Sequence, residues 1–267
     1  MNSRARPWHA GSIVVIHLVV SVLAMATLDC PLAESAAGPG LPAPVAAVSG
    51  LLFAILLLAI TVAGGIVVAG VVRKVLGRPV LATDDTVLAA GFVVLSTLGA
   101  ALVSWPLKHT VGRARPLLSG SCEPFDFEPF SASFSAAYPS TQAAMAGGLA
   151  TALALLNPRW RPVVFFVAAA IGVSRVLAGA HWSSDVIMGL GLGAAVALFL
   201  AGKLGGRGRV FIADRTGFPQ RLTAHDAGSG RPGGAPPPQK AAEPAALYRT
   251  NEGKTDEKWH LGWRRTP

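Results

Sequence analysis

Long runs of apolar residues constrain the fold of this chain more than any other feature of its sequence. Two of them, at about residues 45–72 and 86–105, reach the roughly 20 residues that a membrane-spanning helix needs. Only 14% of the residues are charged and 52% are hydrophobic, whereas about a quarter of the residues in a soluble domain are charged. The sequence therefore predicts an all-α fold, a polytopic membrane helical bundle.

About six runs are predicted to cross the membrane, at residues 13–26, 45–72, 86–105, 139–156, 163–176 and 185–201. The first is either a span or a signal peptide, because Ala24-Met25-Ala26 fits an A-x-A cleavage site. These runs divide the chain into three predicted parts. Residues 1–44 hold the N-terminal span or signal-like segment and an outer loop, residues 45–203 form the membrane domain, and residues 204–267 form a basic, largely disordered tail.

Basic residues are distributed unevenly between the predicted loops. The N-terminus, the loops at 73–78 and 159–161, and the tail fall on one side, which is the cytoplasmic side by the positive-inside rule. Four cations break the rule and fall on the outer side: Lys108, Arg113, Arg115 and Arg175. Charges kept at a membrane face against this bias are functional candidates. Topology therefore accounts for the net charge of +9, and no aromatic-basic patch indicates a nucleic-acid partner.

An imidazole and a carboxylate lie at the junction of the last two predicted spans. His181 and Asp185 are four residues apart, so on a helix they share one face and can touch. The carboxylate would fix the ring tautomer and leave the other ring nitrogen as a base or nucleophile. Arg175 is off that face, but Gly179 allows a bend that brings it to the same point. The alternative is a helix end with a structural arginine and an Asp–His pair.

Two further motifs offer groups that bind anions. Lys108 and Arg115 are seven residues apart, so a continuous helix would present both on one face, with Gly112 between them open to an anion. Basic side chains that snorkel to the membrane interface are the alternative interpretation. Ser140 and Thr141 offer hydroxyl and backbone N–H groups at the start of a predicted helix, where phosphate binds readily.

The three motifs together, Lys-x6-Arg-Pro, Pro-Ser at a helix start and Ser-Arg-x5-His-x3-Asp, resemble those of the type 2 phosphatidic acid phosphatase superfamily, which is related to vanadium haloperoxidases. The resemblance covers about residues 45–203. It implies a phosphatase site without metal or cofactor that acts on a phosphorylated lipid at the outer end of the bundle. His181 would attack phosphorus and form a phosphohistidine, and Asp185 would hold its ring. The groups that would bind the phosphate oxygens are Lys108, Arg115, Ser140, Thr141 and Arg175.

The chain departs from the family motif Pro-Ser-Gly-His, because it has Thr141 and Gln142 in place of the last two residues. The missing histidine is the family's proposed general acid, and glutamine cannot replace it as a proton donor. General acid catalysis is typically worth about 10²–10⁴-fold. The leaving group is then a good one, such as that of a diphosphate or an anomeric sugar phosphate, or His109 supplies the proton although it faces about 100° away from Lys108 on a helix.

Two other functions stay open on the same fold. The protein is a catalytically weak or inactive binder of lipid phosphates, or it is a phosphotransferase that passes the phosphoryl group to an acceptor other than water. In each case we expect a multi-pass protein of the bacterial inner membrane, with its site at the periplasmic face and its tail in the cytoplasm. Cys30 and Cys122 both fall on this oxidising side, where a disulfide would tie the first span to the loop at 120–137.

Overall fold

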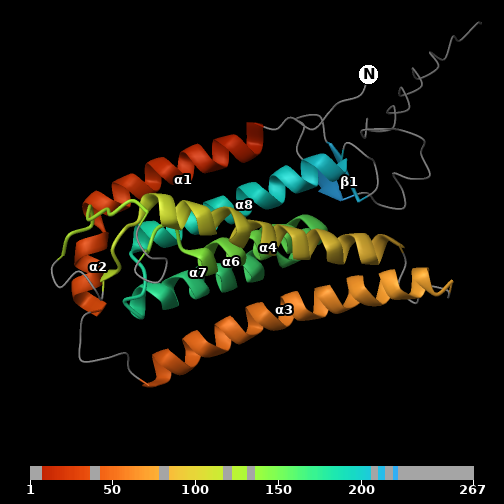
Figure 1. The fold of residues 1–267 in the computed structure, drawn as a ribbon, viewed down its shortest axis with the longest axis horizontal. Helices are drawn as coiled ribbons and strands as arrows, with labels where there is room; N and C mark the ends of the chain where they lie inside the picture. The colour runs from red at the N-terminus through yellow and green to blue at the C-terminus, as the bar shows by residue number, and fades with distance from the viewer. Residues whose placement is uncertain are drawn as a thin grey trace, which may run out of the picture. The chain divides into compact units, whose positions relative to one another are not determined.

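The fold is a bundle of long α-helices, seen in a computed structural model of the chain (Figure 1). The structure describes residues 8–36, 43–77, 84–116, 122–130, 136–205, 210–213 and 219–221. Two compact units divide the chain, Met1–Gly234 and Ala235–Pro267. The second unit lies outside the described residues, so all of the helices and strands belong to the first.

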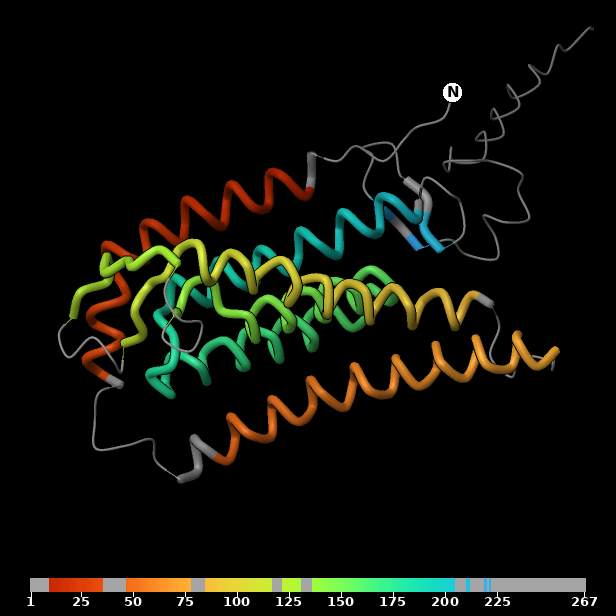
Figure 2. The backbone as a smooth tube through the Cα atoms, viewed as in Figure 1, coloured from red at the N-terminus to blue at the C-terminus, as the bar shows by residue number. Residues whose placement is uncertain are grey.

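The helices in chain order are α1 (Trp8–Thr27), α2 (Asp29–Ala36), α3 (Ala43–Val75), α4 (Asp84–Val111), α6 (Thr141–Leu156), α7 (Arg161–Leu177) and α8 (Ser183–Gly205), and a short 3-10 helix, Pro158–Trp160, precedes α7. Two short antiparallel strands follow, β1 (Phe211–Ala213) and β2 (Pro219–Arg221). Figure 2 follows the same path as a tube.

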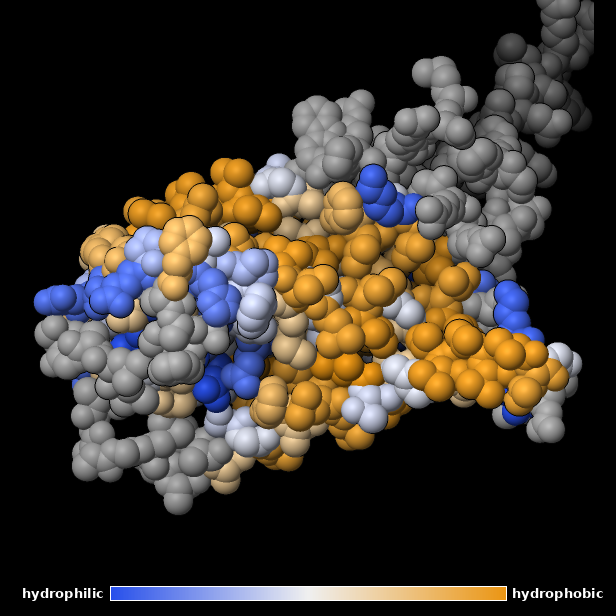
Figure 3. Space-filling model, viewed as in Figure 1, coloured by the Kyte–Doolittle hydropathy of each residue, from blue (hydrophilic) through white to orange (hydrophobic). Residues whose placement is uncertain are grey.

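Five of these helices, α1, α3, α4, α7 and α8, are long and apolar enough to cross a membrane. The sixth predicted span corresponds to α6, which has 16 residues, or roughly 24 Å of helix against a hydrocarbon core of about 30 Å. Apolar side chains cover the middle of the face drawn in Figure 3, and hydrophilic ones gather toward its ends. The chain is a multi-pass, all-α membrane protein, as predicted, although the count of six spans is not confirmed.

Helices α6 and α8 form the centre of the bundle and pack closely on each other. Small residues make this approach possible, because a Cβ added to Gly193 would overlap the carbonyl oxygen of Ala144, and one added to Gly147 would overlap that of Leu190. Such contacts between small residues are typical of helix packing in membranes. Around this pair, α1 packs on α8, α4 packs on both, and α3 contacts α4 and α7.

Two ordered elements were not predicted from the sequence. Helix α2 occupies part of the segment interpreted as an outer loop. The β1–β2 hairpin lies within residues 204–267, which we assigned to the tail, and its Phe211 ring is buried edge-on against Phe92 of α4, with ring centroids 4.8 Å apart. Most of the remaining tail lies outside the described residues, and the bounds of the three predicted parts stay predictions.

Candidate active site

The chain brings its sequence motifs together at one end of the bundle, where α4 and α7 end and α6 and α8 begin (Figure 1, left). Backbone hydrogen bonds join these ends to one another. Ser140 N, at the start of α6, donates to the carbonyl oxygen of Asp185 in α8 at 3.1 Å. The backbone N–H of Ala137 donates to the carbonyl of Arg113, just after α4, at 2.6 Å. The predicted site residues are therefore carried by segments that contact each other.

His181 and Asp185 contact each other, as the sequence predicted. Nδ1 of His181 lies 3.6 Å from Oδ2 of Asp185, a distance typical of an ion pair and longer than a hydrogen bond. The two residues do not share a helix, because α8 begins only at Ser183. His181 instead precedes α8, after a turn in which Gly179 has a φ of +60°. This left-handed conformation is the bend that we expected from Gly179.

The imidazole of His181 is buried, with 4% of the residue exposed. This burial lowers the pKa of His181 below its ordinary value, since a low-dielectric surrounding disfavours the charged ring. Asp185 acts in the opposite direction, and the positive charges of Lys108 and Arg115 lower the pKa further. The ring is therefore neutral near pH 7 and keeps a lone pair on one nitrogen.

Lys108 and Arg115 lie near this imidazole, and Arg175 lies near both of these cations. Lys108 is buried, and its Nζ donates to the carbonyl oxygens of Ala136 at 3.0 Å and Ala137 at 3.4 Å. An ammonium has three donors, so one remains for a ligand. Arg115 and Arg175 are half-buried, and the Nε of each is without a hydrogen-bond partner in the described structure. The charge of Arg115 acts on both Lys108 and Arg175, so the three form one positive cluster.

The helical geometry predicted for Lys108 and Arg115 is wrong. Helix α4 ends at Val111, and Gly112 follows it in the left-handed region with a φ of +62°. The chain then runs extended, with bridges from Arg113 and Ala114 to distant segments, so Lys108 and Arg115 share no helix face. The open side of Gly112 faces no anion either, because a Cβ there would overlap the carbonyl oxygen of Glu128.

The start of α6 has the features of a phosphate site. Ser140 is its N-cap, and its hydroxyl accepts from the backbone N–H of Ala143 at 3.4 Å. Thr141 is the first helical residue. The N–H groups of the first turn have no acceptor within the helix and carry its positive dipole end. This end of α6 can therefore offer an anion both hydrogen-bond donors and partial positive charge.

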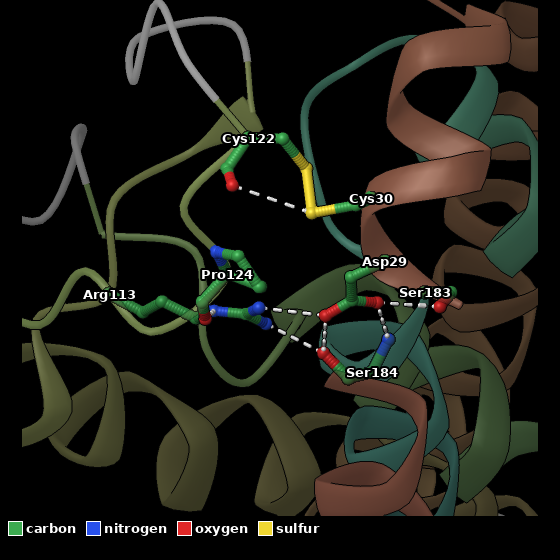
Figure 4. Close-up of a disulfide and its surroundings, with 7 residues drawn as sticks. All are labelled: Asp29, Cys30, Arg113, Cys122, Pro124, Ser183 and Ser184. Atoms are coloured by element: carbon green, nitrogen blue, oxygen red, sulfur yellow. Dashed lines mark hydrogen bonds and ion pairs between the residues drawn. A yellow bond between two sulfur atoms is a disulfide. The ribbon is translucent and has the colours of Figure 1, made fainter. Parts of the chain in front are cut away.

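The sequence did not reveal the role of Arg113 and Asp29, whose side chains point toward each other (Figure 4). The guanidinium of Arg113 is fully buried and forms ion pairs with both Asp185, at 2.6 Å, and Asp29, at 2.7 Å. Arg113 was recognised only as one of four outer cations, and Asp29 was not singled out. A possible signal for Asp29 was its place beside Cys30, at the end of the first apolar run.

Cys30 and Cys122 form a disulfide, which the sequence left open (Figure 4). The bond joins α2 to the segment at residues 122–130. Arg113 donates from Nε to the carbonyl of Pro124, two residues beyond Cys122, at 2.8 Å. The disulfide and the Arg113 contacts therefore hold the same two segments together.

Comparison with known proteins agrees with this arrangement of motifs. Residues 89–208 match the family model of the PAP2 superfamily. The matched segment carries all three motifs that the sequence shares with this superfamily.

Two curated relatives are similar to part of the chain. A lipid A 1-phosphatase of Rhizobium johnstonii is 37% identical over 131 residues, which are 48% of this chain and 53% of the relative. A lipid A 1-phosphatase of Rhizobium etli is 44% identical over 99 residues, 36% of this chain and 41% of the relative. The chain thus spans about half the length of the curated relatives that it matches.

Among solved structures, the chain matches the first transmembrane PAP2-type phosphatidylglycerolphosphate phosphatase from Bacillus subtilis. The TM-score is 0.48 and the sequence identity is 21%, over 74% of this chain and 96% of that one.

Gln142, at the position of the motif acid, and His109, its proposed substitute, lie in different surroundings. Gln142 is the second residue of α6 and is half-buried beside Thr141. The ring of His109 packs edge-on against Trp105, with centroids 4.5 Å apart, and Trp105 is 59% exposed. His109 thus lies against an outward-facing side chain of α4, an arrangement that favours a structural role for its ring.

Proposed function

We propose that this chain is a membrane phosphatase that hydrolyses a lipid phosphate or lipid diphosphate through a phosphohistidine intermediate. One observation carries the proposal: a buried imidazole with a lowered pKa lies beside Asp185 and within the field of Lys108 and Arg115. A neutral imidazole is a nucleophile, and cations around it stabilise the charge that develops on a transferred phosphoryl group.

The reaction follows from this arrangement in two steps. The lone pair on Nε2 of His181 attacks phosphorus, and the P–N bond forms as the bond from phosphorus to the lipid oxygen breaks. The electron pair leaves with that oxygen, which takes up a proton. Water then attacks phosphorus, the P–N bond breaks with its electrons returning to Nε2, and inorganic phosphate leaves. Asp185 faces Nδ1 throughout, and its negative charge stabilises the positive ring.

The phosphate oxygens bind to the remaining predicted residues. Lys108, Arg115 and Arg175 supply positive charge, and two of them present guanidinium forks that suit a tetrahedral oxyanion. Ser140 and the backbone N–H groups at Thr141 supply neutral donors from the start of α6. The three positive charges exceed the two negative charges of a phosphate dianion. The site should therefore bind both its phosphorylated substrate and inorganic phosphate.

For the substrate, we propose a lipid whose phosphate sits at the anomeric position of a sugar. The curated relatives are both named lipid A 1-phosphatase, and position 1 of a sugar is its anomeric carbon. A good leaving group needs little protonation, which fits Gln142 in the place of the motif acid. A lipid diphosphate, whose leaving group is a phosphate, satisfies the same requirement.

We further propose that the site faces the periplasm in the inner membrane of a bacterium. Lys108 and Arg175 lie near the ends of α4 and α7. By contrast, Arg159 and Arg161 lie at the start of α7, and Arg73 and Lys74 lie at the end of α3, which packs beside the start of α4. The positive-inside rule places the second group in the cytoplasm. The disulfide, which forms in oxidising compartments, lies at the end that holds the site.

The test is phosphate release by the full chain purified in detergent, with lipid A, an isoprenoid diphosphate and phosphatidic acid as substrates. We expect release from the first two, slower release from phosphatidic acid, and none from His181→Ala. Gln142→His should raise turnover on phosphatidic acid by more than turnover on lipid A. An equal rise on all three lipids would contradict the leaving-group argument.

The same assay separates the alternatives. A phosphotransferase would consume the lipid phosphate without releasing inorganic phosphate. Its turnover would depend on an added alcohol acceptor. Wild-type protein that retains labelled lipid A in a filter-binding assay but shows no turnover dependent on His181 would be a lipid-phosphate binder. Arg175→Ala should then lose that binding.

A further inference from the structure

Asp185 makes hydrogen bonds in addition to its contact with the ring of His181. Its Oδ2 accepts from the backbone N–H of Trp182 at 2.8 Å and faces Nδ1 of His181. Its Oδ1 accepts from Nη1 of Arg113 at 2.6 Å. Because each oxygen has a fixed donor, the plane of the carboxylate is set before any substrate binds. The residue that sets Oδ1 is Arg113.

Arg113 is itself held from three directions. Its Nε donates to the carbonyl of Pro124, its Nη1 also donates to Ser184 Oγ at 2.6 Å, and its Nη2 pairs with Asp29. The guanidinium carbon lies 5.0 Å from the centroid of the Trp182 ring. Lysine carries its donors on a single nitrogen and lacks the planar fork that spans acceptors as far apart as these. The position therefore requires the fork of an arginine.

Asp29 completes this group from the N-terminal part of the chain. Its Oδ1 accepts from Ser183 Oγ at 2.6 Å and from the backbone N–H of Ser184 at 3.0 Å, and its Oδ2 accepts from Arg113 and from Ser184 Oγ (Figure 4). Asp29 is 1% exposed. Its side chain thus accepts hydrogen bonds from the first turn of α8, the same turn that carries Asp185.

We propose that Asp29 and Arg113 are positioning residues for the nucleophile, acting on His181 through Asp185. The proposal rests on the proposed function above. Asp29 lies 60 residues before the PAP2 segment begins at residue 89, so α2 contributes to the site from outside the matched family segment. Two carboxylates share one guanidinium, which leaves this buried group with one net negative charge behind a neutral imidazole.

The geometry gives two substitutions with opposite electrostatic effects. Asp29→Asn removes a negative charge and keeps the shape, so the net charge behind His181 becomes zero and the protonated ring loses stabilisation. Arg113→Met removes the positive charge, so the protonated ring gains stabilisation. The titration of His181 should therefore move to lower pH in the first variant and to higher pH in the second. Lys108, Arg115 and Asp185, which also act on this ring, stay unchanged in both.

The experiment reads His181 directly and does not depend on turnover. The full chain, labelled with ¹⁵N-histidine in detergent, gives the tautomer and titration of His181 by NMR, with its signals assigned by their loss in His181→Ala. Phosphate release from lipid A is measured in parallel as kcat and KM. Glu123→Gln is the matched control, since this acid adjoins Cys122 as Asp29 adjoins Cys30, but it is exposed.

We expect wild type to carry its proton on Nδ1, and Asp29→Asn and Arg113→Met to shift the titration in opposite directions. Both should lower kcat about 10- to 100-fold, the range for a small misplacement of a reacting group, while KM stays within about twofold because neither residue binds phosphate. Arg113→Lys should resemble Arg113→Met in kcat, since it lacks the fork. Glu123→Gln should match wild type.

Unchanged titration and unchanged kcat in Asp29→Asn would overturn the proposal and leave these residues a purely structural role. Should Arg113→Met fail to fold, as judged by size-exclusion chromatography, Asp29→Asn and Arg113→Lys decide the question. Failure of the proposed function looks different: wild type would then show no turnover dependent on His181, and the NMR titration would still report whether Asp29 and Arg113 act on the ring.

Discussion

Ser140 and Asp185 are joined through their backbones, since the N–H of Ser140 donates to the carbonyl oxygen of Asp185 at 3.1 Å. Ser140 is the N-cap of α6, and Asp185 lies in the first turn of α8. This bond ties the helix start that would bind phosphate to the residue that would orient the nucleophile. The two helices need not be aligned by substrate, because their first turns are already fixed against each other.

This relationship separates two roles of Ser140. Ser140→Ala keeps the backbone bond to Asp185 but loses the hydroxyl that accepts from Ala143 N. We expect a cost of about 1 kcal/mol in the free energy of unfolding, typical of a lost N-cap. The loss in kcat/KM should correspond to more than about 1 kcal/mol, because a group that binds phosphate is also lost. Thermal unfolding and phosphate release check the two effects, and Ser140→Thr, which keeps a hydroxyl, should restore most of both.

The pH dependence of activity follows from the burial of His181. Burial lowers its pKa below the ordinary value of 6.5, and only the neutral ring attacks phosphorus. Activity is therefore present above the lowered pKa and lost as the pH falls through it. A profile of kcat/KM against pH should show its acidic limb below pH 6.5. An acidic limb at or above pH 6.5 would mean that Asp185 raises the pKa of His181 by at least as much as burial lowers it.

The same shift affects stability in a defined direction. Below about pH 6.5 the unfolded chain protonates this histidine while the folded chain does not, so the unfolded state binds more protons. Stability should rise with pH across the interval between the lowered pKa and 6.5. His181→Gln should flatten that part of the curve of unfolding temperature against pH, and an unaltered slope would contradict the assignment.

The disulfide should support both the fold and the site. It links residues 92 positions apart, and a closed loop of about this length is worth up to roughly 4–5 kcal/mol in the chain-entropy model. Cys30 adjoins Asp29, so reduction of the disulfide should also loosen the contacts between Asp29 and Arg113. We expect dithiothreitol to lower both the unfolding temperature and the turnover of wild type. Cys122→Ser should start at the lower values and be insensitive to the reductant.

The fold was largely predictable because each span is encoded locally. A run of about 20 apolar residues must form a helix in lipid, where every backbone group needs an internal partner. The sixth predicted span, α6, stays unconfirmed for a related reason: its residues are apolar and small, so hydropathy indicates a span, but the helix is short and central. Helix α2 and the β1–β2 hairpin are not apolar runs of this length, and hydropathy does not find them.

The site was predictable where its residues are close in the chain. His181 and Asp185 are four apart, and any tight turn or helix brings them together. Asp29 and Arg113 are 84 residues apart, and no local spacing indicates that they meet. Lys108 and Arg115 gave a false helical register because Gly112, interpreted as an opening for an anion, is instead the residue at which α4 stops.

Gly112 therefore offers a direct test of how the site is built. It adopts a φ of +62°, and its missing side chain leaves room for the carbonyl of Glu128, whose N–H donates to Gly112 O at 2.8 Å. Gly112→Ala forces a strained conformation and a clash with backbone that cannot move freely. We expect a clear loss in unfolding temperature together with a loss of turnover, since the same turn directs Arg113 and Arg115.

Gly91 provides the matched control for this substitution. It lies within the same helix, α4, where a Cβ would meet only a methyl group of Val67 at an ordinary 3.9 Å. Alanine is favoured over glycine in a helix by about 1 kcal/mol, so Gly91→Ala should leave the protein as stable as wild type or slightly more so. If Gly112→Ala and Gly91→Ala behaved alike, the close approach of Glu128 would not be what requires glycine at the end of α4.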